Sequence, residues 1–150
     1  MAITGAKTLA FEQALLDHVF RGEGTLDIAL HIGLVTGTPT VTDLGASTWH
    51  TTHEVAADKG YLRQALTDAN MGSANGDGIT LNSAEINFGT STGVSASAAA
   101  WGTVTGFIIS TEAAIGSATT YYYGIFDTPK SVAEGDSVRI TTNNLSIDER

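Results

Sequence analysis

Residues 102–127 read GTVTGFIISTEAAIGSATTYYYGIFD, and this stretch decides the expected fold. In 102–111, small Gly and Thr residues alternate with larger apolar ones such as Val104, which is typical of a tightly packed strand. The segment 118–127 is expected to form the next strand, and the Gly-Ser pair at 116–117 is a turn signal between them. The stretch therefore predicts two strands separated by a turn.

The same type of pattern continues in both directions from this stretch. Residues 26–35, LDIALHIGLV, alternate strictly, with Leu and Ile at every even position on one face, which indicates a strand buried on one side. About seven or eight antiparallel strands at roughly ten-residue spacing predict a mainly β protein, a jelly roll or β-sandwich. The remaining strands are predicted at 61–69, 78–89 (two pieces), 136–142 and 144–149, with turns at 75–78, 127–130 and 134–136.

One amphipathic helix is predicted near the N-terminus, at residues 7–20. Phe11, Leu15 and Val19 recur every four residues, and Leu16 and Phe20 widen this apolar stripe. The glycines of RGEG at 21–24 end the helix. Such a helix can cover a face of the sheet or dock on a neighbouring subunit. We expect an N-terminal arm and helix at 1–25 and a β-sandwich or jelly roll at 26–150, together forming a single domain.

Composition excludes several classes of function. Charged residues make up 15% of the 150-residue chain, below the roughly 25% of an average soluble domain, and the net charge is −9. The seven cations are scattered singly, so we expect no nucleic-acid partner and no membrane partner. The absence of cysteine excludes disulfides, Cys-ligated metals and thiol catalysis. The N-terminal sequence does not resemble a signal peptide, so synthesis in a host cytoplasm is expected.

Two motifs resemble sites of catalysis or metal binding. GTSTG at 89–93 fits G-x-S-x-G, but no helix is expected after Ser91 and all four histidines precede it, so a nucleophile elbow is not expected. His50, His53 and Glu54 in WHTTHE are weak candidates for a metal site, although Thr51 and its neighbours are poor helix formers. The carboxylates fall mostly in turns and form no evident pair. We therefore expect no enzyme activity and no cofactor.

The surfaces most suited to contacts are neutral or aromatic. Residues 36–60 show no sustained period, and 89–101 form a small, uncharged segment in which burial against another subunit would cost little. Tyr121 and Tyr123 share one strand face, and Tyr122 lies on the other, so core packing and an interface both stay open. The candidate interface residues are Phe11, Leu15, Trp49, Thr90, Ser91, Val94, Trp101, Tyr121 and Tyr123.

The second half of the chain resembles a family of small virion proteins of tailed bacteriophages, often described as tail-fibre-like. The aromatic-Gly block ending in Pro-Lys and the Trp-Gly-Thr-Val-Thr block are its most telling parts. The resembling segments are YLRQALT (61–67), NSAEINFGTSTG (82–93), WGTVTGFIIS (101–110), YYYGIFDTPKSVAEGDSVRI (121–140) and NNLSI (143–147).

The resemblance implies a virion role and carries over no active-site residues. Some members of this family are capsid cement, or decoration, proteins with a jelly-roll or β-sandwich fold. The leading hypothesis is a cement protein on the outer capsid surface that binds the major capsid protein and itself, as a dimer or trimer, and stabilises the assembled lattice. The alternative is a tail-fibre or tail-tip component that binds a host-surface glycan. A virion-associated glycan hydrolase is the third hypothesis.

Overall fold

The computed structural model describes residues 3–22, 29–38, 50–92, 100–115 and 119–148. The predicted fold class is confirmed: the chain is mainly β, its strands pair antiparallel, and a short helix lies near its N-terminus. The elements are β1 (Ile3–Lys7), α1 (Leu9–Leu16), η1 (Asp17–Arg21), β2 (Leu30–Val35), α3 (His50–His53), η2 (Ala57–Lys59), β3 (Gln64–Leu66), β4 (Ile79–Leu81), β5 (Ile86–Thr90), β6 (Gly102–Ser110), β7 (Thr120–Val132), β8 (Ser137–Ile140) and β9 (Ser146–Asp148).

The main sheet has five strands in the order β1-β7-β6-β2-β3. Its centre is the pair β6–β7, formed by the stretch that the sequence marks most clearly, with Ile108 opposite Tyr123. Strand β6 packs tightly against β7 at Gly106, because a Cβ atom there would overlap the Gly124 carbonyl oxygen. A side chain at this point would push the central strands apart.

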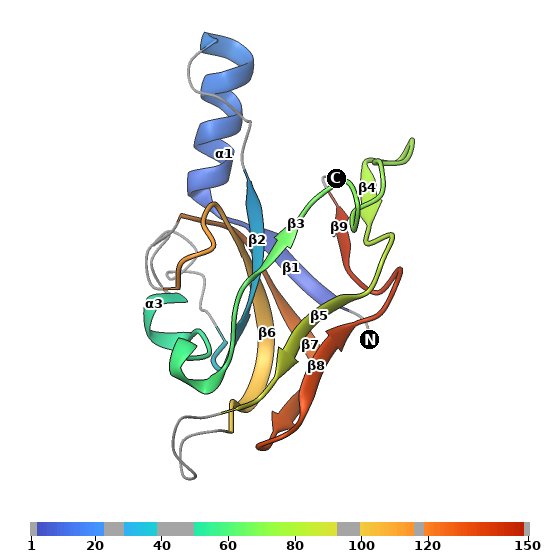
Figure 1. The fold of residues 1–150 in the computed structure, drawn as a ribbon. Helices are drawn as coiled ribbons and strands as arrows, with labels where there is room; N and C mark the ends of the chain where they lie inside the picture. The colour runs from blue at the N-terminus through green and yellow to red at the C-terminus, as the bar shows by residue number, and fades with distance from the viewer. Residues whose placement is uncertain (1–2, 23–28, 39–49, 93–99, 116–118, 149–150) are drawn as a thin grey trace.

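A second layer lies across the main sheet and completes a sandwich. It consists of two antiparallel pairs, β5–β8 and β4–β9, and β5 and β8 lie in front of β6 and β7 in Figure 1. Strands of both layers contribute to one buried apolar cluster, which holds them together. This core contains Ile32, Leu34, Val55, Tyr61, Ile86, Phe88, Trp101, Val104, Phe107, Ile109, Phe126, Val132, Val138, Ile140 and Leu145.

Each strand predicted from the sequence has a counterpart, and most are shorter than expected. The sequence predicts a turn at 127–130, and this prediction is wrong: the chain does not reverse there, because these residues lie within β7. Lys130 pairs with Val104 and Ile125 with Gly106, so 126–129 lie opposite a single residue of β6 and form a bulge. Proline is tolerated at such a bulge because the ladder does not need its missing N–H there.

The N-terminal segment differs most from the expectation. Residues 3–7 form the edge strand β1, which was not predicted, and Lys7 lies opposite Tyr122 of β7. The helix therefore begins after Thr8, whose hydroxyl accepts a hydrogen bond from the Phe11 N–H at 3.4 Å and donates one to the Thr120 carbonyl at 2.6 Å. The helix continues as the π-helical turn η1 and ends at Gly22, which has a left-handed φ of 63°.

Helix α1 extends away from the sandwich and touches it mainly at its first turn (Figure 1). The Phe11 ring lies 5.1 Å from the ring of Tyr121 and 4.9 Å from that of Tyr122. The predicted stripe is correct for Phe11 and Leu15, which are half-buried. It is wrong for Leu16, Val19 and Phe20, which are exposed because the helix has passed the end of the sheet. None of the helices in the described ranges is long and apolar enough to span a membrane.

Candidate interaction surface and buried polar cluster

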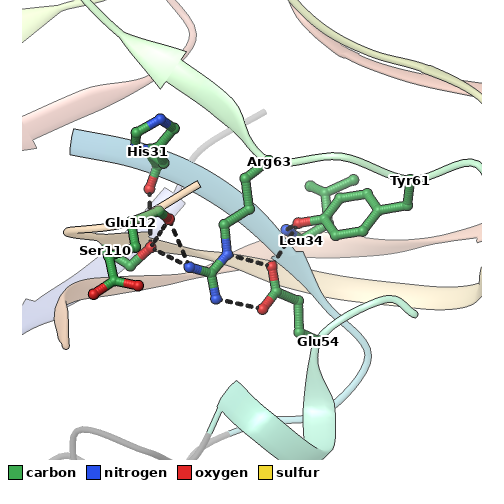
Figure 2. Close-up of polar contacts among 7 residues, drawn as sticks. All are labelled: His31, Leu34, Glu54, Tyr61, Arg63, Ser110 and Glu112. Atoms are coloured by element: carbon green, nitrogen blue, oxygen red, sulfur yellow. Dashed lines mark hydrogen bonds and ion pairs between the residues drawn. The ribbon is translucent and has the colours of Figure 1, made fainter. Parts of the chain in front are cut away.

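An ion pair is buried between the helical turn α3 and strand β3. Arg63 Nε donates to Glu54 Oε1 at 2.7 Å, and Arg63 Nη2 donates to Glu54 Oε2 at 2.6 Å (Figure 2). The exposed fractions of the two side chains are 0% and 1%, so the charges are withdrawn from water and depend on each other. This bidentate geometry suits the planar guanidinium.

Further hydrogen bonds complete the cluster around this pair. The Tyr61 hydroxyl donates to Glu54 Oε1 at 2.9 Å and accepts the Leu34 N–H at 2.7 Å. Arg63 Nη1 donates to the Ser110 hydroxyl at 2.9 Å and to the Glu112 carbonyl at 2.7 Å. Burial, with a smaller contribution from the Glu54 carboxylate, raises the pKa of Tyr61 well above its usual value. The cluster links α3, β2, β3 and β6.

This arrangement assigns Glu54 a different role from the one considered in the sequence. Both of its oxygens accept hydrogen bonds from Arg63, so it is not free to act as the third ligand of a metal site. His50 and His53 do lie on one helical turn, contrary to the expected irregular loop, and the ring of His53 lies 2.9 Å from the Thr52 hydroxyl. Within the ranges that the structure describes, no three His, Asp or Glu side chains gather around a possible metal position.

The sequence analysis missed Arg63 and Tyr61. A usable signal was present, since two residues separated by one position in a strand-like segment lie on the same face. Tyr61 is a core residue, and Arg63 is therefore directed inward beside it. An inward arginine requires a carboxylate or several carbonyl partners.

Ser91 lies in the interior and is not at an exposed interface. It is fully buried, its N–H donates to the Asp136 carbonyl at 2.8 Å, and its carbonyl accepts the Gly135 N–H at 2.9 Å. These bonds attach the end of β5 to the turn before β8. Thr90 is exposed within β5, whereas Val94 lies outside the described residues.

The aromatic interface candidates are also mostly internal. Trp101 is buried, its ring packs edge-on against Tyr61 at 5.6 Å, and its Nε1 donates to the Lys59 carbonyl at 2.8 Å. Tyr121 is buried beneath Phe11, and Tyr123 is half-buried. Both rings are therefore covered within the chain and stabilise the fold, and a contact surface at Trp101 and Tyr121 stays a prediction. Trp49 lies outside the described residues.

The largest exposed apolar side chains gather on the N-terminal helix. We define the helix patch as Leu9, Leu16, Val19 and Phe20, which are 51%, 54%, 59% and 79% exposed. Isolated exposed apolar residues are ordinary on protein surfaces, but four on one short projecting helix make a candidate contact surface. Leu62, at 66%, is exposed on the β-sandwich and lies outside this patch.

Comparison with known proteins assigns the chain to a family. The family model described as "Podophage GP4 fiber I protein gp80" matches residues 6–148, which covers nearly the whole sandwich and the helix. A search of curated proteins found no match. The match supports the expected class of phage virion structural protein. The chain therefore belongs to the podophage GP4 fiber I protein gp80 family and is a structural protein of the virion.

Proposed function

We propose that this chain is a structural component of a tail fibre and that it acts by binding other virion proteins through the helix patch. The observation that carries the proposal is the exposure of Leu9, Leu16, Val19 and Phe20 on a helix that projects from the sandwich. The family is a fibre family, which favours the tail-fibre alternative over the leading hypothesis of a capsid cement protein on the outer capsid surface. The major capsid protein is accordingly not the partner proposed.

The helix patch can contribute substantially to a protein contact. Complete burial of an aliphatic or aromatic side chain contributes about 1.5–3 kcal/mol. Scaled by the exposed fractions, the four side chains of the patch offer about 4–7 kcal/mol. Association costs about 4–15 kcal/mol before any contact is counted. The patch therefore supports binding when the partner contributes a comparable apolar surface.

The proposed role involves neither catalysis nor a cofactor. The Glu54–Arg63 pair is buried, and both of its side chains are hydrogen-bonded within the chain. The net charge of −9 favours a protein partner over a nucleic acid or an anionic membrane. Binding of a host glycan is not included in the proposal, because the rings of Trp101 and Tyr121 are buried.

Fractionation of purified virions into heads and tails tests this proposal. The chain should be found with the tails, in a copy number of a few to tens per particle by quantitative mass spectrometry. Recovery with the heads in hundreds of copies would overturn the tail-fibre assignment and restore the cement hypothesis.

A second arm of the experiment tests the helix patch. Particles assembled with the variant Leu16→Ser/Phe20→Ser should lack the chain, whereas Leu62→Ser, which changes an equally exposed leucine outside the patch, should be incorporated normally. Normal incorporation of the double variant would show that the patch is not the attachment surface.

A further inference from the structure

We infer that Asn75 is a site of spontaneous modification, at which the backbone nitrogen of Gly76 attacks the asparagine side chain and releases ammonia. An Asn-Gly pair occurs once in the sequence, at 75–76, and it lies in the exposed loop that leads into β4. Glycine hinders the attack least because it carries no Cβ atom. The reaction would take place on the folded chain and is independent of the helix patch.

The loop around this pair leaves the attacking nitrogen open. Asn75 N–H donates to the Ile79 carbonyl at 2.8 Å, and Gly78 N–H donates to the Asn75 carbonyl at 3.1 Å, which closes a tight reversal. Within the described part of the chain, the Gly76 N–H makes no hydrogen bond. Residues 75–78 are all exposed. The Gly76 N–H is therefore accessible to the base that must remove its proton.

The side chain under attack is held and polarised by the same loop. Asn75 Oδ1 accepts the N–H of Asp77 at 2.9 Å and that of Ile79 at 3.0 Å. These bonds hold the carboxamide over the chain that follows Asn75, which contains the attacking nitrogen. When this nitrogen adds to Cγ, negative charge develops on Oδ1, and two N–H donors at such distances stabilise that charge.

The reaction needs no reagent other than water. The Gly76 nitrogen loses its proton and bonds to Asn75 Cγ, the bond from Cγ to the amide nitrogen breaks, and that nitrogen leaves with a proton as ammonia. Water then adds to one carbonyl of the resulting succinimide and breaks one of its C–N bonds. Opening at Cγ gives aspartate, whereas opening at the backbone carbonyl gives isoaspartate, in which the chain continues through the side chain.

Asp77 also precedes a glycine, but the structure disfavours it. The Gly78 N–H that would attack is already bonded to the Asn75 carbonyl. An ionised carboxylate is also a poorer acceptor of a nucleophile than a carboxamide. Reaction at Asp77 would release no ammonia, so the two sites are distinguishable.

Asn87 provides a matched internal control. It is exposed, and its Oδ1 accepts the Gly89 N–H at 2.9 Å, much as Asn75 Oδ1 accepts the Asp77 N–H. The attacking nitrogen there belongs to Phe88, whose side chain is buried. Strand β5 must open before this nitrogen can reach Cγ, and loss of the buried ring lowers the reactive population by about ten- to hundredfold.

The two products should affect the loop differently. Aspartate keeps the acceptor at Oδ1, so the reversal should persist. Isoaspartate adds one atom to the backbone, so the hydrogen bonds that join Asn75 to Gly78 and Ile79 lose their register. Because Ile79 begins β4 and lies opposite Asp148 of β9, this change should loosen the β4–β9 pair. A virion protein is not replaced after assembly, so the products should accumulate as particles age.

Incubation of the folded chain at neutral pH and physiological temperature, followed by peptide mass mapping, tests the inference. The peptide that contains Asn75 should gain the mass difference between NH₂ and OH about ten- to hundredfold faster than the peptide that contains Asn87. Part of the product should resist cleavage before position 75 by an aspartate-specific protease, which identifies isoaspartate. An intact Asn75, or modification no faster than at Asn87, would overturn the inference.

The variant Gly76→Ala tests the role of the attacking nitrogen. A Cβ atom on Gly76 would meet no atom within 4 Å, and its φ lies outside the left-handed region, so the variant should fold normally. The methyl group hinders the approach to Cγ and should slow modification at Asn75 without changing the rate at Asn87. Equal rates at Asn75 in the two proteins would contradict attack by the Gly76 nitrogen.

Amide hydrogen exchange tests the effect on the fold. The isoaspartate fraction should exchange faster than fresh protein at 79–81, whereas Asn75→Asp should not. Equally fast exchange in Asn75→Asp would show that the added charge, and not the added backbone atom, loosens β4.

Discussion

Replacing Glu54 by glutamine should destabilise the protein far more than a similar change at its surface. The carboxylate accepts three hydrogen bonds, from Arg63 Nε, Arg63 Nη2 and the Tyr61 hydroxyl. Glutamine removes the charge and places an NH₂ group where one of these donors already points. Because the side chains of the pair are 0% and 1% exposed, water cannot solvate the charged guanidinium that remains. The expected loss is about 3–5 kcal/mol, out of a typical total stability of about 5–15 kcal/mol.

A surface pair in the same chain provides the control. Arg139 and Glu85 lie 3.5 Å apart, and their side chains are 54% and 41% exposed. Glu85→Gln should therefore cost no more than about 1 kcal/mol. Urea unfolding followed by the fluorescence of buried Trp101 measures both variants. If Glu54→Gln and Glu85→Gln lose the same free energy of unfolding, the argument from burial is refuted.

The double variant Glu54→Gln/Arg63→Met separates the net contribution of the pair from the cost of breaking it. Each single substitution leaves one buried charge without its partner, but the double substitution leaves none. Its loss of stability should be smaller than the sum of the single losses by about 2 kcal/mol or more. Strict additivity would mean that the two side chains do not interact in the folded protein.

Three further changes follow from the structure. The pKa of Tyr61 is raised in the folded chain, so as the pH rises above about 10 the unfolded chain loses the Tyr61 hydroxyl proton first. The free energy of unfolding should therefore fall above this pH by up to about 1.4 kcal/mol per pH unit. Urea titrations between pH 9 and 11.5 should show a shallower fall for Tyr61→Phe. Gly106→Ala should cost about 1–3 kcal/mol or more, because its methyl group overlaps the Gly124 carbonyl, and an unchanged melting temperature would contradict this. Phe11→Ala should speed amide hydrogen exchange across residues 9–21 while leaving β6 and β7 protected, because it removes the ring contacts that hold the helix on the sheet.

The strands were predictable because each carries its own local signal. In β2, Ile32 and Leu34 lie in the core as their alternation indicates, but the expected one-sided burial is wrong because Gly33 and Val35 on the other face are buried too. The break between β4 and β5 was visible in the sequence as well. Strand β1 carries no such signal in ITGAK, and it exists because β7 presents an edge to pair with. The bulge at 126–129 could not be predicted either, because the residue types that favour a turn are the same whether the chain reverses or only kinks.

The buried cluster depends on contacts that no local pattern encodes. Glu54 was grouped with His50 and His53 because they are neighbours in sequence, yet its partner Arg63 is nine residues away, immediately before β3. The two meet because β3 pairs with β2 while Val55 is fixed beside Leu34 by a backbone hydrogen bond of 3.0 Å. The buried ion pair is thus a consequence of the topology. The sequence indicates it only through the spacing of Tyr61 and Arg63, which places Arg63 on the same inward face as Tyr61.

The helix shows why an amphipathic pattern alone cannot identify a binding surface. Its sequence is apolar on more than one side, so the pattern alone does not decide whether Phe11 or Leu16 faces the sheet. Packing decides between them, since β1 and the Thr8 cap place the first turn so that Phe11 reaches β7. Leu16 and Phe20 are then left without cover by the sandwich, on a helix that has passed its end. The part of an apolar helix that its own fold does not cover is the part available to another chain, and for this virion protein we propose the assembly contact there.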